Sequence, residues 1–476
     1  MKNLRTILVA LGLVVVPVLL LMAMLGVADG TMAPKPGVFA PGGETASGGG
    51  WSPLATLIVQ MAAIIALSRV VALGLMKLKQ PRVVGEIAAG LLLGPSLLGV
   101  LSPELYATLF PASSFSLLGM FANIGVVLFM FLVGIEFQPK LLQGQGATVA
   151  VTSHAAIVVP FLAGVALAFA IFEPLAPAGV DFRSFALFIG AAFSVTAFPV
   201  LARILSERKL TRTRMGVVAL GVAAICNAAA WLILAGVTVL VRATEGGTPI
   251  WLTVTAVLAY AAAALFGLRP LLAWLYERTD KRAWVGQTGL ALILMLVLIN
   301  AFATDRLGLH ALFGGFIAGL VLPKEDALTD GLLAKLEDFT VVFMLPLYFA
   351  FTGLRTSFGS LGTAEGWFFM TVILAVAVAG KLVGATLAAK ATGSSWRDAA
   401  GVGVLVNTRA LMELIIINMA LDLGVITTDL FSMLVIMALA TTAMTTPLLD
   451  WLYPRQTDNE AAPAAPSEPL VLAGSA

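Results

Sequence analysis

The stretch SVTAFPVLARIL, residues 194–205, decides how the rest of the chain is read, because polar residues and a proline interrupt it. Ser194, Thr196 and Pro199 stand in the middle of a segment that is otherwise apolar enough to cross a bilayer. Proline removes one backbone donor of a helix and displaces the carbonyl one turn earlier, and in lipid such freed groups must face protein or water. A broken span at this depth is typical of a transport site.

The composition places this segment in a membrane protein. Of the 476 residues, 60% are hydrophobic and 11% are charged, and a water-soluble domain cannot bury so much apolar surface. The net charge is +2. The basic residues lie in short clusters between apolar runs, which argues against a nucleic-acid partner. The single cysteine, Cys226, permits no intrachain disulfide and no cysteine-based metal site. We also find no GxGxxG unit, nucleophile–base constellation or metal-ligand cluster, so we expect neither an enzyme nor a cofactor.

Fourteen apolar segments of spanning or near-spanning length follow one another along the chain. About 20 residues cross a bilayer core, so the two segments near 15 residues are borderline. If all fourteen cross, both termini share a side. We therefore expect an inner-membrane protein with both termini in the cytoplasm, because this orientation satisfies the positive-inside rule. The basic loop residues left outside are few: Lys35, Arg183, Arg242, Arg306 and Arg355. The segments cover residues 7–27, 53–76, 83–101, 116–135, 147–172, 184–206, 215–241, 250–268, 284–303, 308–322, 339–354, 367–389, 398–420 and 430–452.

The two ends of the chain differ from the transmembrane part, 53–453. Residues 1–27 combine a basic start with an apolar run, so they read as a cleaved signal peptide or as a retained first helix, and the length of the run favours the helix. Residues 28–52, rich in Gly, Pro, Ala and Ser, are expected to form a flexible external loop. The Pro- and Ala-rich tail, 454–476, is expected to be disordered in the cytoplasm.

Four polar residues lie near the midpoints of their spans: Thr196, Asn227, Lys381 and Arg409. A charge at that depth costs roughly 2.5–3.5 kcal/mol on the insertion scale. Four such groups at one depth predict a shared cavity, and the competing interpretation is a buried structural ion pair.

Two glutamates are candidates to balance these charges. Glu413 follows Arg409 by four residues, so on a helix the two share a face and can neutralise each other, which leaves Lys381 as the unpaired cation. Glu86, near the cytoplasmic end of its span, either lines an entrance or pairs with Arg82.

The two halves of the chain correspond to each other in pattern. Each half has a Gly-rich span, GLLLGPSLLG or GGFIAGLVLP, and a polar-interrupted span, SVTAFPV or VNTRALME, followed by one more helix. The two interrupted spans run in opposite directions in the topology given above. This pattern predicts an inverted repeat with two broken helices crossing at the membrane midplane.

Seven blocks of sequence, in order between about Pro53 and Tyr453, resemble the monovalent cation:proton antiporter-2 family, in particular its cation/proton exchanger branch. The resemblance implies an all-α, thirteen-helix antiporter fold with inverted repeats, two crossed broken helices and an extra or signal-like N-terminal helix. It also implies a mobile core beside a scaffold, elevator-like alternating access and a homodimer. The blocks are PRVVGEIAAGLLLGPSLLG, LFMFLVGIEFQPKLL, FSVTAFPVLARILSERKL, LHALFGGFIAGLVLP, LPLYFAFTGLRT, AGKLVGAT and NTRALMELIIINMALDLGVIT.

Site residues are carried over from the family by matching its motifs. The Ser194 to Pro199 stretch matches the first broken helix, whose backbone and hydroxyls line the ion site. Lys381 resembles the family's core lysine, which carries protons or pairs with a carboxylate. The second broken helix is matched by Asn407, Arg409 and Glu413.

The helix after the first broken span departs from the family pattern. Relatives usually read Asp-Asp, Asn-Asp or Gln-Asp before xxxW, and the second residue is the carboxylate that alternately holds a cation and protons. Here the pair is Cys226-Asn227. Asparagine does not titrate, so Lys381 loses its expected counter-ion, and either the buried lysine itself carries the proton or Glu413 or Glu86 supplies the charge. Cys226 prefers soft metals and is a weak ligand for Na⁺ or K⁺.

We therefore expect a secondary transporter that exchanges a monovalent cation, Na⁺ or K⁺, for protons, with the lipid bilayer as its other partner. Two alternatives stay open because of Asn227. One is a transporter of the same fold that moves another solute, such as an anion attracted to Lys381 and to helix N-termini. The other is a transport-inactive sensor or regulator.

Overall fold

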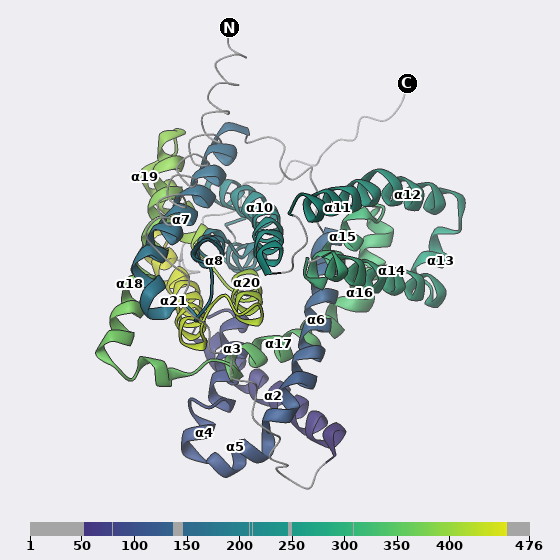
Figure 1. The fold of residues 1–476 in the computed structure, drawn as a ribbon. Coiled ribbons are helices and arrows are strands. Elements are labelled where there is room, and N and C mark those ends of the chain that lie inside the picture. Colours follow the sequence, from purple (N-terminus) through teal and green to yellow (C-terminus); the bar gives the residue numbers. More distant parts are fainter. Residues whose placement is uncertain are drawn as a thin grey trace, which may run out of the picture.

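The structure is a computed structural model that describes residues 52–78, 80–136, 146–208, 210–211, 213–245, 250–307 and 309–454, and the regular elements in these ranges are all helices (Figure 1). The all-α expectation is confirmed. The predicted first helix, nearly all of the predicted external loop and nearly all of the predicted tail lie outside the described residues.

The helices follow the apolar segments of the sequence closely. Ten described helices are long and apolar enough to span a membrane, or eleven if the bent pair α19–α20 counts as one span. The predicted segment 308–322 corresponds to α15, which has only 11 residues, so the count of thirteen spans stays a prediction. In order, the elements are α2 (Pro53–Lys77), α3 (Arg82–Leu93), α4 (Leu98–Leu101), α5 (Pro103–Leu109), η1 (Ala112–Ser114), α6 (Phe115–Glu136), α7 (Gly146–Leu175), α8 (Phe182–Ser194), α9 (Phe198–Glu207), α10 (Arg214–Glu245), α11 (Ile250–Ala262), η3 (Ala263–Leu268), α12 (Arg269–Arg278), α13 (Lys281–Val285), α14 (Gln287–Arg306), α15 (Ala311–Val321), α16 (Asp326–Asp338), η4 (Phe339–Met344), α17 (Leu345–Leu354), η5 (Phe358–Leu361), α18 (Ala364–Ala391), α19 (Trp396–Val406), α20 (Leu411–Asp422) and α21 (Thr428–Leu452).

The helices form two groups that pack mainly within themselves. The core group contains α7 to α10 and α18 to α21, and α7 is its centre, packed on α8, α10 and α18. The scaffold group contains α2 to α6 and α11 to α17. In Figure 1 the core group lies on one side, α11 to α16 lie on the other, and α17 passes below α20 and α21. The two groups meet along few elements, among them α17 with α20 and α10 with α11.

Two core spans are broken, as the sequence predicts. Helix α8 begins behind Asp181, whose carboxylate accepts a hydrogen bond from the backbone N–H of Ser184 at 3.2 Å, and it ends at Ser194. Extended backbone follows, with Val195 at φ −73° and ψ 149°. Helix α9 then begins with Pro199 in its first turn, where the missing N–H breaks no helical bond. The second broken span joins α19 and α20 at an angle of 41°.

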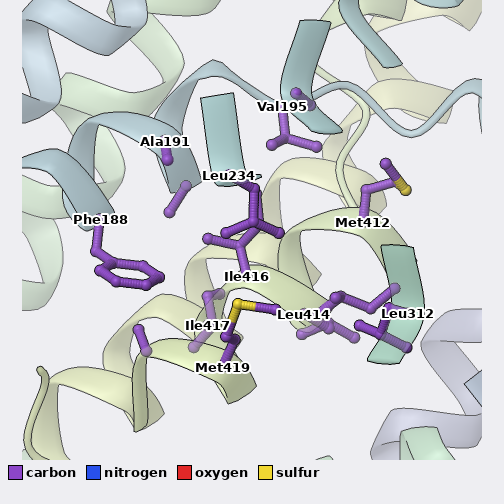
Figure 2. Packing of buried hydrophobic residues seen from close by; sticks show 14 of the residues in the cluster. Phe188, Ala191, Val195, Leu234, Leu312, Met412, Leu414, Ile416, Ile417 and Met419 are labelled. Carbon is purple, nitrogen blue, oxygen red and sulfur yellow. The ribbon is translucent and has the colours of Figure 1, made fainter. Parts of the chain in front are cut away.

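Helix α20 is buried from its start almost to its end, which is unusual for a membrane helix. Figure 2 shows why: Ile416 and Leu414 of α20 lie between Phe188 of α8, Leu234 of α10 and Leu312 of α15. Helix α20 therefore packs against both the core and the scaffold, so its position depends on how the two groups sit against each other.

Small residues let the scaffold helices approach closely. A Cβ atom at Gly134 of α6 would lie 2.2 Å from the carbonyl oxygen of Phe316, and one at Gly319 of α15 would lie 2.2 Å from that of Phe131. Neither position tolerates a side chain. Backbones in contact at small residues are a usual way to hold membrane helices together, so α6 and α15 form a rigid pair.

Candidate ion site at the crossing of two broken helices

The two helix breaks touch each other at the centre of the core group. The backbone N–H of Ala197, between α8 and α9, donates to the carbonyl of Thr408, between α19 and α20, at 2.9 Å. The Thr196 hydroxyl donates to the carbonyl of Val406, the last residue of α19, at 3.1 Å. The predicted crossing of the broken helices is confirmed, and it is held by one backbone hydrogen bond and one from a threonine hydroxyl.

The end of α8 shows where the buried cations are needed. The last four carbonyls of a helix have no partner within it, and those of α8 all accept hydrogen bonds. The Ser194 hydroxyl donates to Ala191 at 2.9 Å, and Lys381 donates to Ser194. Arg409 supplies the other two bonds, from Nη1 to Ala192 at 3.0 Å and from Nη2 to Phe193 at 3.1 Å. Two full positive charges thus face the negative end of the α8 dipole.

Lys381 of α18 is fully buried, and among the described residues its hydrogen-bond acceptors are backbone carbonyls. Its second acceptor is the carbonyl of Ala156 in α7, at 2.8 Å. That carbonyl is free because Pro160, four residues later, has no N–H to donate to it. An ammonium group has three N–H donors, and the described residues accept from two of them.

Arg409 and Glu413 form the ion pair that their spacing predicts, with Nη1 and Oε1 2.8 Å apart and both side chains fully buried. The expectation that both residues lie on one helix face is wrong, however. Arg409 lies in the break and not on the helix, because α20 begins at Leu411 behind the extended Ala410. Glu413 lies in the first turn of α20 and therefore also balances the positive end of that helix dipole.

Three buried side-chain oxygens near the breaks have no hydrogen-bond partner among the described residues: Oε2 of Glu413, Oδ1 of Asn227 and Oδ1 of Asn407. They belong to α20, to α10 and to the break after α19. An unsatisfied buried oxygen usually has a function or bonds to water or an ion, and carboxylate and amide oxygens are suitable ligands for a hard cation.

Cys226 and Asn227, the pair that departs from the family pattern, lie in α10. This helix packs on α7, α8, α9 and α19. Asn227 is buried. Cys226 is fully buried as well, with its Sγ atom 4.0 Å from the Ser153 carbonyl oxygen. The Cys226 thiol also interacts with the Thr196 hydroxyl and with Lys381. Cys226 is thus a small packing residue placed directly beside the charged cluster.

Glu86 lies apart from this cluster. It is buried in α3 of the scaffold, and the charges that act on it are those of Arg69, Arg82 and Arg203. It is not among the titratable groups that act on Lys381, which are Cys226, Arg409 and Glu413. Among the expected site residues, the structure brings together Ser194, Thr196, Cys226, Lys381, Arg409 and Glu413, places the buried Asn227 and Asn407 on elements next to them, and leaves Glu86 outside.

Sequence reasoning missed two supports of the cluster. The first is the Ala156 carbonyl, although Pro160 inside a span signals a free carbonyl four residues earlier. The second is a row of hydroxyls in α21: Thr442 donates to the carbonyl of Arg409, and Thr408 donates to Thr445 at 3.2 Å. The run TTAMTT, residues 441–446, carries that signal in the sequence.

The cluster combines two buried cations with one carboxylate. Within the part of the chain that the structure describes, no group of three His, Cys, Asp or Glu side chains could hold a metal ion. The charges present are two cations and one carboxylate, so one positive charge is in excess, and the negative end of α8 offsets part of it.

Comparison with known proteins gives consistent matches. A family model described as "Sodium/hydrogen exchanger, transmembrane" matches residues 62–451. The "Na(+)/H(+) antiporter NhaS4" of Synechocystis is 38% identical over 402 residues, which cover 84% of this chain and 98% of that protein. "Cation/H(+) antiporter 17" of Arabidopsis thaliana is 37% identical over 84% of this chain and 48% of its own length. "K(+)/H(+) antiporter 1" of Saccharomyces cerevisiae is 33% identical over 85% of this chain and 47% of its own length.

The chain therefore spans nearly all of the cyanobacterial relative and about half of the plant and yeast relatives. Among solved structures, the sodium proton antiporter MjNhaP1 from Methanocaldococcus jannaschii at pH 8 matches with a TM-score of 0.56 and 14% identity, over 84% of this chain and 97% of that one. At this identity the match concerns the fold alone.

Proposed function

The chain belongs to the sodium/hydrogen exchanger family, and on that premise we propose that it exchanges a monovalent cation, Na⁺ or K⁺, for protons at the crossing of its two broken helices. The family expected from the sequence motifs is thereby confirmed. The observation that carries the proposal is the buried cluster itself. Two cations and one carboxylate are held where two broken helices meet. One oxygen of that carboxylate and the amide oxygens of Asn227 and Asn407 have no hydrogen-bond partner among the described residues.

The cation would bind to oxygens at the crossing. Oε2 of Glu413 and the amide oxygens of Asn227 and Asn407 are buried and have no partner in the described ranges, and together they offer one charged ligand and two neutral ones. The Arg409 guanidinium cannot lose its proton in a protein, and its charge is already neutralised by Glu413. The remaining obstacle to an incoming cation is therefore the ammonium charge of Lys381.

Lys381 is accordingly the group that we expect to exchange its proton. A neutral amine keeps two N–H donors, and the described residues accept two hydrogen bonds from Lys381, at Ala156 and Ser194. The lysine can thus release its third proton without giving up its support of α7 and α8. One cation entering and one proton leaving makes the exchange electrically neutral. Lys381 thereby does the work of the titrating carboxylate that is absent at Asn227.

Exchange across a membrane also requires that the site face the two sides in turn. The division into a core group and a scaffold group supports a movement of the core, because the two groups share few contacts. We further propose that the protein is a homodimer in an inner membrane with its termini in the cytoplasm. The distribution of Lys and Arg in the sequence supports this orientation.

Everted membrane vesicles with a pH-sensitive dye test the proposal. Adding Na⁺, K⁺ or Li⁺ between pH 6 and pH 9 should collapse a preset proton gradient for at least one cation. Lys381→Ala should abolish this response. Lys390→Ala is the matched control, because Lys390 lies on the same helix but bonds to Ser394, near the end of α18, and should leave exchange intact.

A second candidate function has one observation in its favour, the excess positive charge that remains because Asn227 carries no carboxylate. A transporter of this kind would move an anion. If no cation collapses the gradient in a folded protein, while chloride or another anion does, the anion transporter replaces the exchanger. A folded protein that responds to neither ion would be a sensor or regulator.

A further inference from the structure

One polar network joins the scaffold to the core where the C-terminal ends of α17 and α20 meet. Arg355 follows the last residue of α17, in the scaffold, and its Nη2 atom lies 2.6 Å from Oδ1 of Asp422, the last residue of α20, in the core. Its Nη1 atom donates to Oδ1 of Asn418, also in α20, at 3.2 Å. One guanidinium thus bonds to two side chains across the boundary.

Asn418 extends the network back into the scaffold. Its Nδ2 atom donates to the Thr352 hydroxyl at 2.9 Å and to the Tyr348 hydroxyl at 3.3 Å, both on α17. Asn418 is buried, so these bonds are protected from water. Breaking one of them without a replacement leaves a buried polar group unsatisfied.

Helix α21 is held at the same place. The backbone N–H of Ser357 donates to the Ser432 hydroxyl at 2.9 Å, and the Arg355 guanidinium lies over the Phe431 ring at 5.6 Å. The Arg355 side chain is 20% exposed and that of Asp422 is 43% exposed. The network therefore reaches from buried Asn418 to the molecular surface and covers this end of the boundary.

We propose that Arg355, Asn418 and Asp422 are positioning residues for transport, which hold the core against the scaffold at this end and must separate before the ion site can open to that side. They act through α20, because this helix carries Glu413 in its first turn and Asp422 at its last residue. A contact that fixes the end of α20 to α17 therefore also fixes the carboxylate of the site. This inference rests on the proposed transport function, but the experiment that tests it does not require transport.

Cys226, the only cysteine of the chain, provides the test. It lies beside Lys381 and Thr196 in the core, so the rate at which a membrane-impermeant methanethiosulfonate reagent labels it reports on access from the side to which the reagent is added. The protein is labelled in sealed vesicles of both orientations, without any ion gradient, and Cys226→Ser gives the background. Labelling requires no exchange activity, so failure of this inference and failure of the exchange proposal are distinguishable.

Arg355→Ala should raise labelling from the Arg355 side roughly two- to fivefold, the range expected for a partly exposed ion pair, and should lower labelling from the other side. The double variant Arg355→Asp with Asp422→Arg exchanges the two charges of the ion pair, so both labelling rates should return toward those of wild type. Lys281→Ala is the matched control, since Lys281 and Glu325 form an exposed ion pair at 2.8 Å within the scaffold, and it should change neither rate. Labelling that is the same in Arg355→Ala and Lys281→Ala, or that rises equally from both sides, would overturn the inference.

Discussion

Replacement of Arg409 by methionine separates two roles that the structure gives to this side chain. Arg409 neutralises Glu413, and it also supplies the donors for the carbonyls of Ala192 and Phe193 at the end of α8. Methionine is unbranched like the aliphatic part of arginine and has neither charge nor donors. The variant leaves Glu413 buried without its partner, which costs about 3–5 kcal/mol, and it also leaves the two α8 carbonyls without donors.

A second substitution then distinguishes the roles. If Arg409 served only to neutralise Glu413, the double variant Arg409→Met with Glu413→Met would regain most of the lost stability, because apolar replacements of a buried ion pair are often neutral. In the structure, two carbonyls of α8 would remain without donors. Each unsatisfied buried group costs roughly 1–3 kcal/mol, so the double variant should stay about 2–6 kcal/mol less stable than wild type.

Thermal unfolding of the purified protein in detergent, followed by the loss of its monodisperse elution peak, gives the ranking. Wild type should be most stable, the Glu413→Met and double variants lower, and Arg409→Met clearly destabilised. A double variant with the same unfolding midpoint as wild type would refute the conclusion that Arg409 completes the hydrogen bonding of α8.

Three further predictions follow from other parts of the structure. Asn227→Asp adds a titrating carboxylate to α10 next to Cys226, so transport should move a second proton per cation and become sensitive to membrane potential, measured in proteoliposomes with a potassium–valinomycin clamp. Pro160→Ala restores a backbone donor for the Ala156 carbonyl, so Lys381→Met should destabilise the protein by about 1 kcal/mol less in that background, measured as a double-mutant cycle of unfolding midpoints. Gly319→Leu must force α6 and α15 apart and should lower stability by about 1–3 kcal/mol or more, whereas Gly74→Leu, with no atom within 4 Å of a Cβ, should leave the midpoint unchanged.

The broken helices could be predicted because their signal is local. Polar residues and Pro199 interrupt an otherwise apolar span, and the arrangement repeats around Asn407. Both breaks are present, and they meet through backbone groups of Ala197 and Thr408. The span count was less predictable, since α15 has only 11 helical residues and its place depends on close packing against α6.

The partners of the buried charges could be predicted only in part. The spacing of Arg409 and Glu413 indicated their pairing. The position of Arg409 in the break, however, depends on the crossing of two spans, and Arg409 and its partner Ala192 are 217 residues apart in the sequence. Pro160 signals a free carbonyl at Ala156, but no local pattern shows that Lys381 would supply the donor. Glu86 is a buried carboxylate like Glu413, and only the fold shows that it belongs to the scaffold.

Proton release on cation binding shows whether the two ions compete for the crossing of the broken helices. Purified protein in weakly buffered detergent solution is titrated with NaCl or KCl at constant ionic strength, and the pH change is read with a soluble indicator. The account predicts one proton released for each cation bound to wild type and none released by Lys381→Met. Cation binding to wild type without proton release, or undiminished release from Lys381→Met, would contradict the claim that cation and proton compete at the crossing of the broken helices.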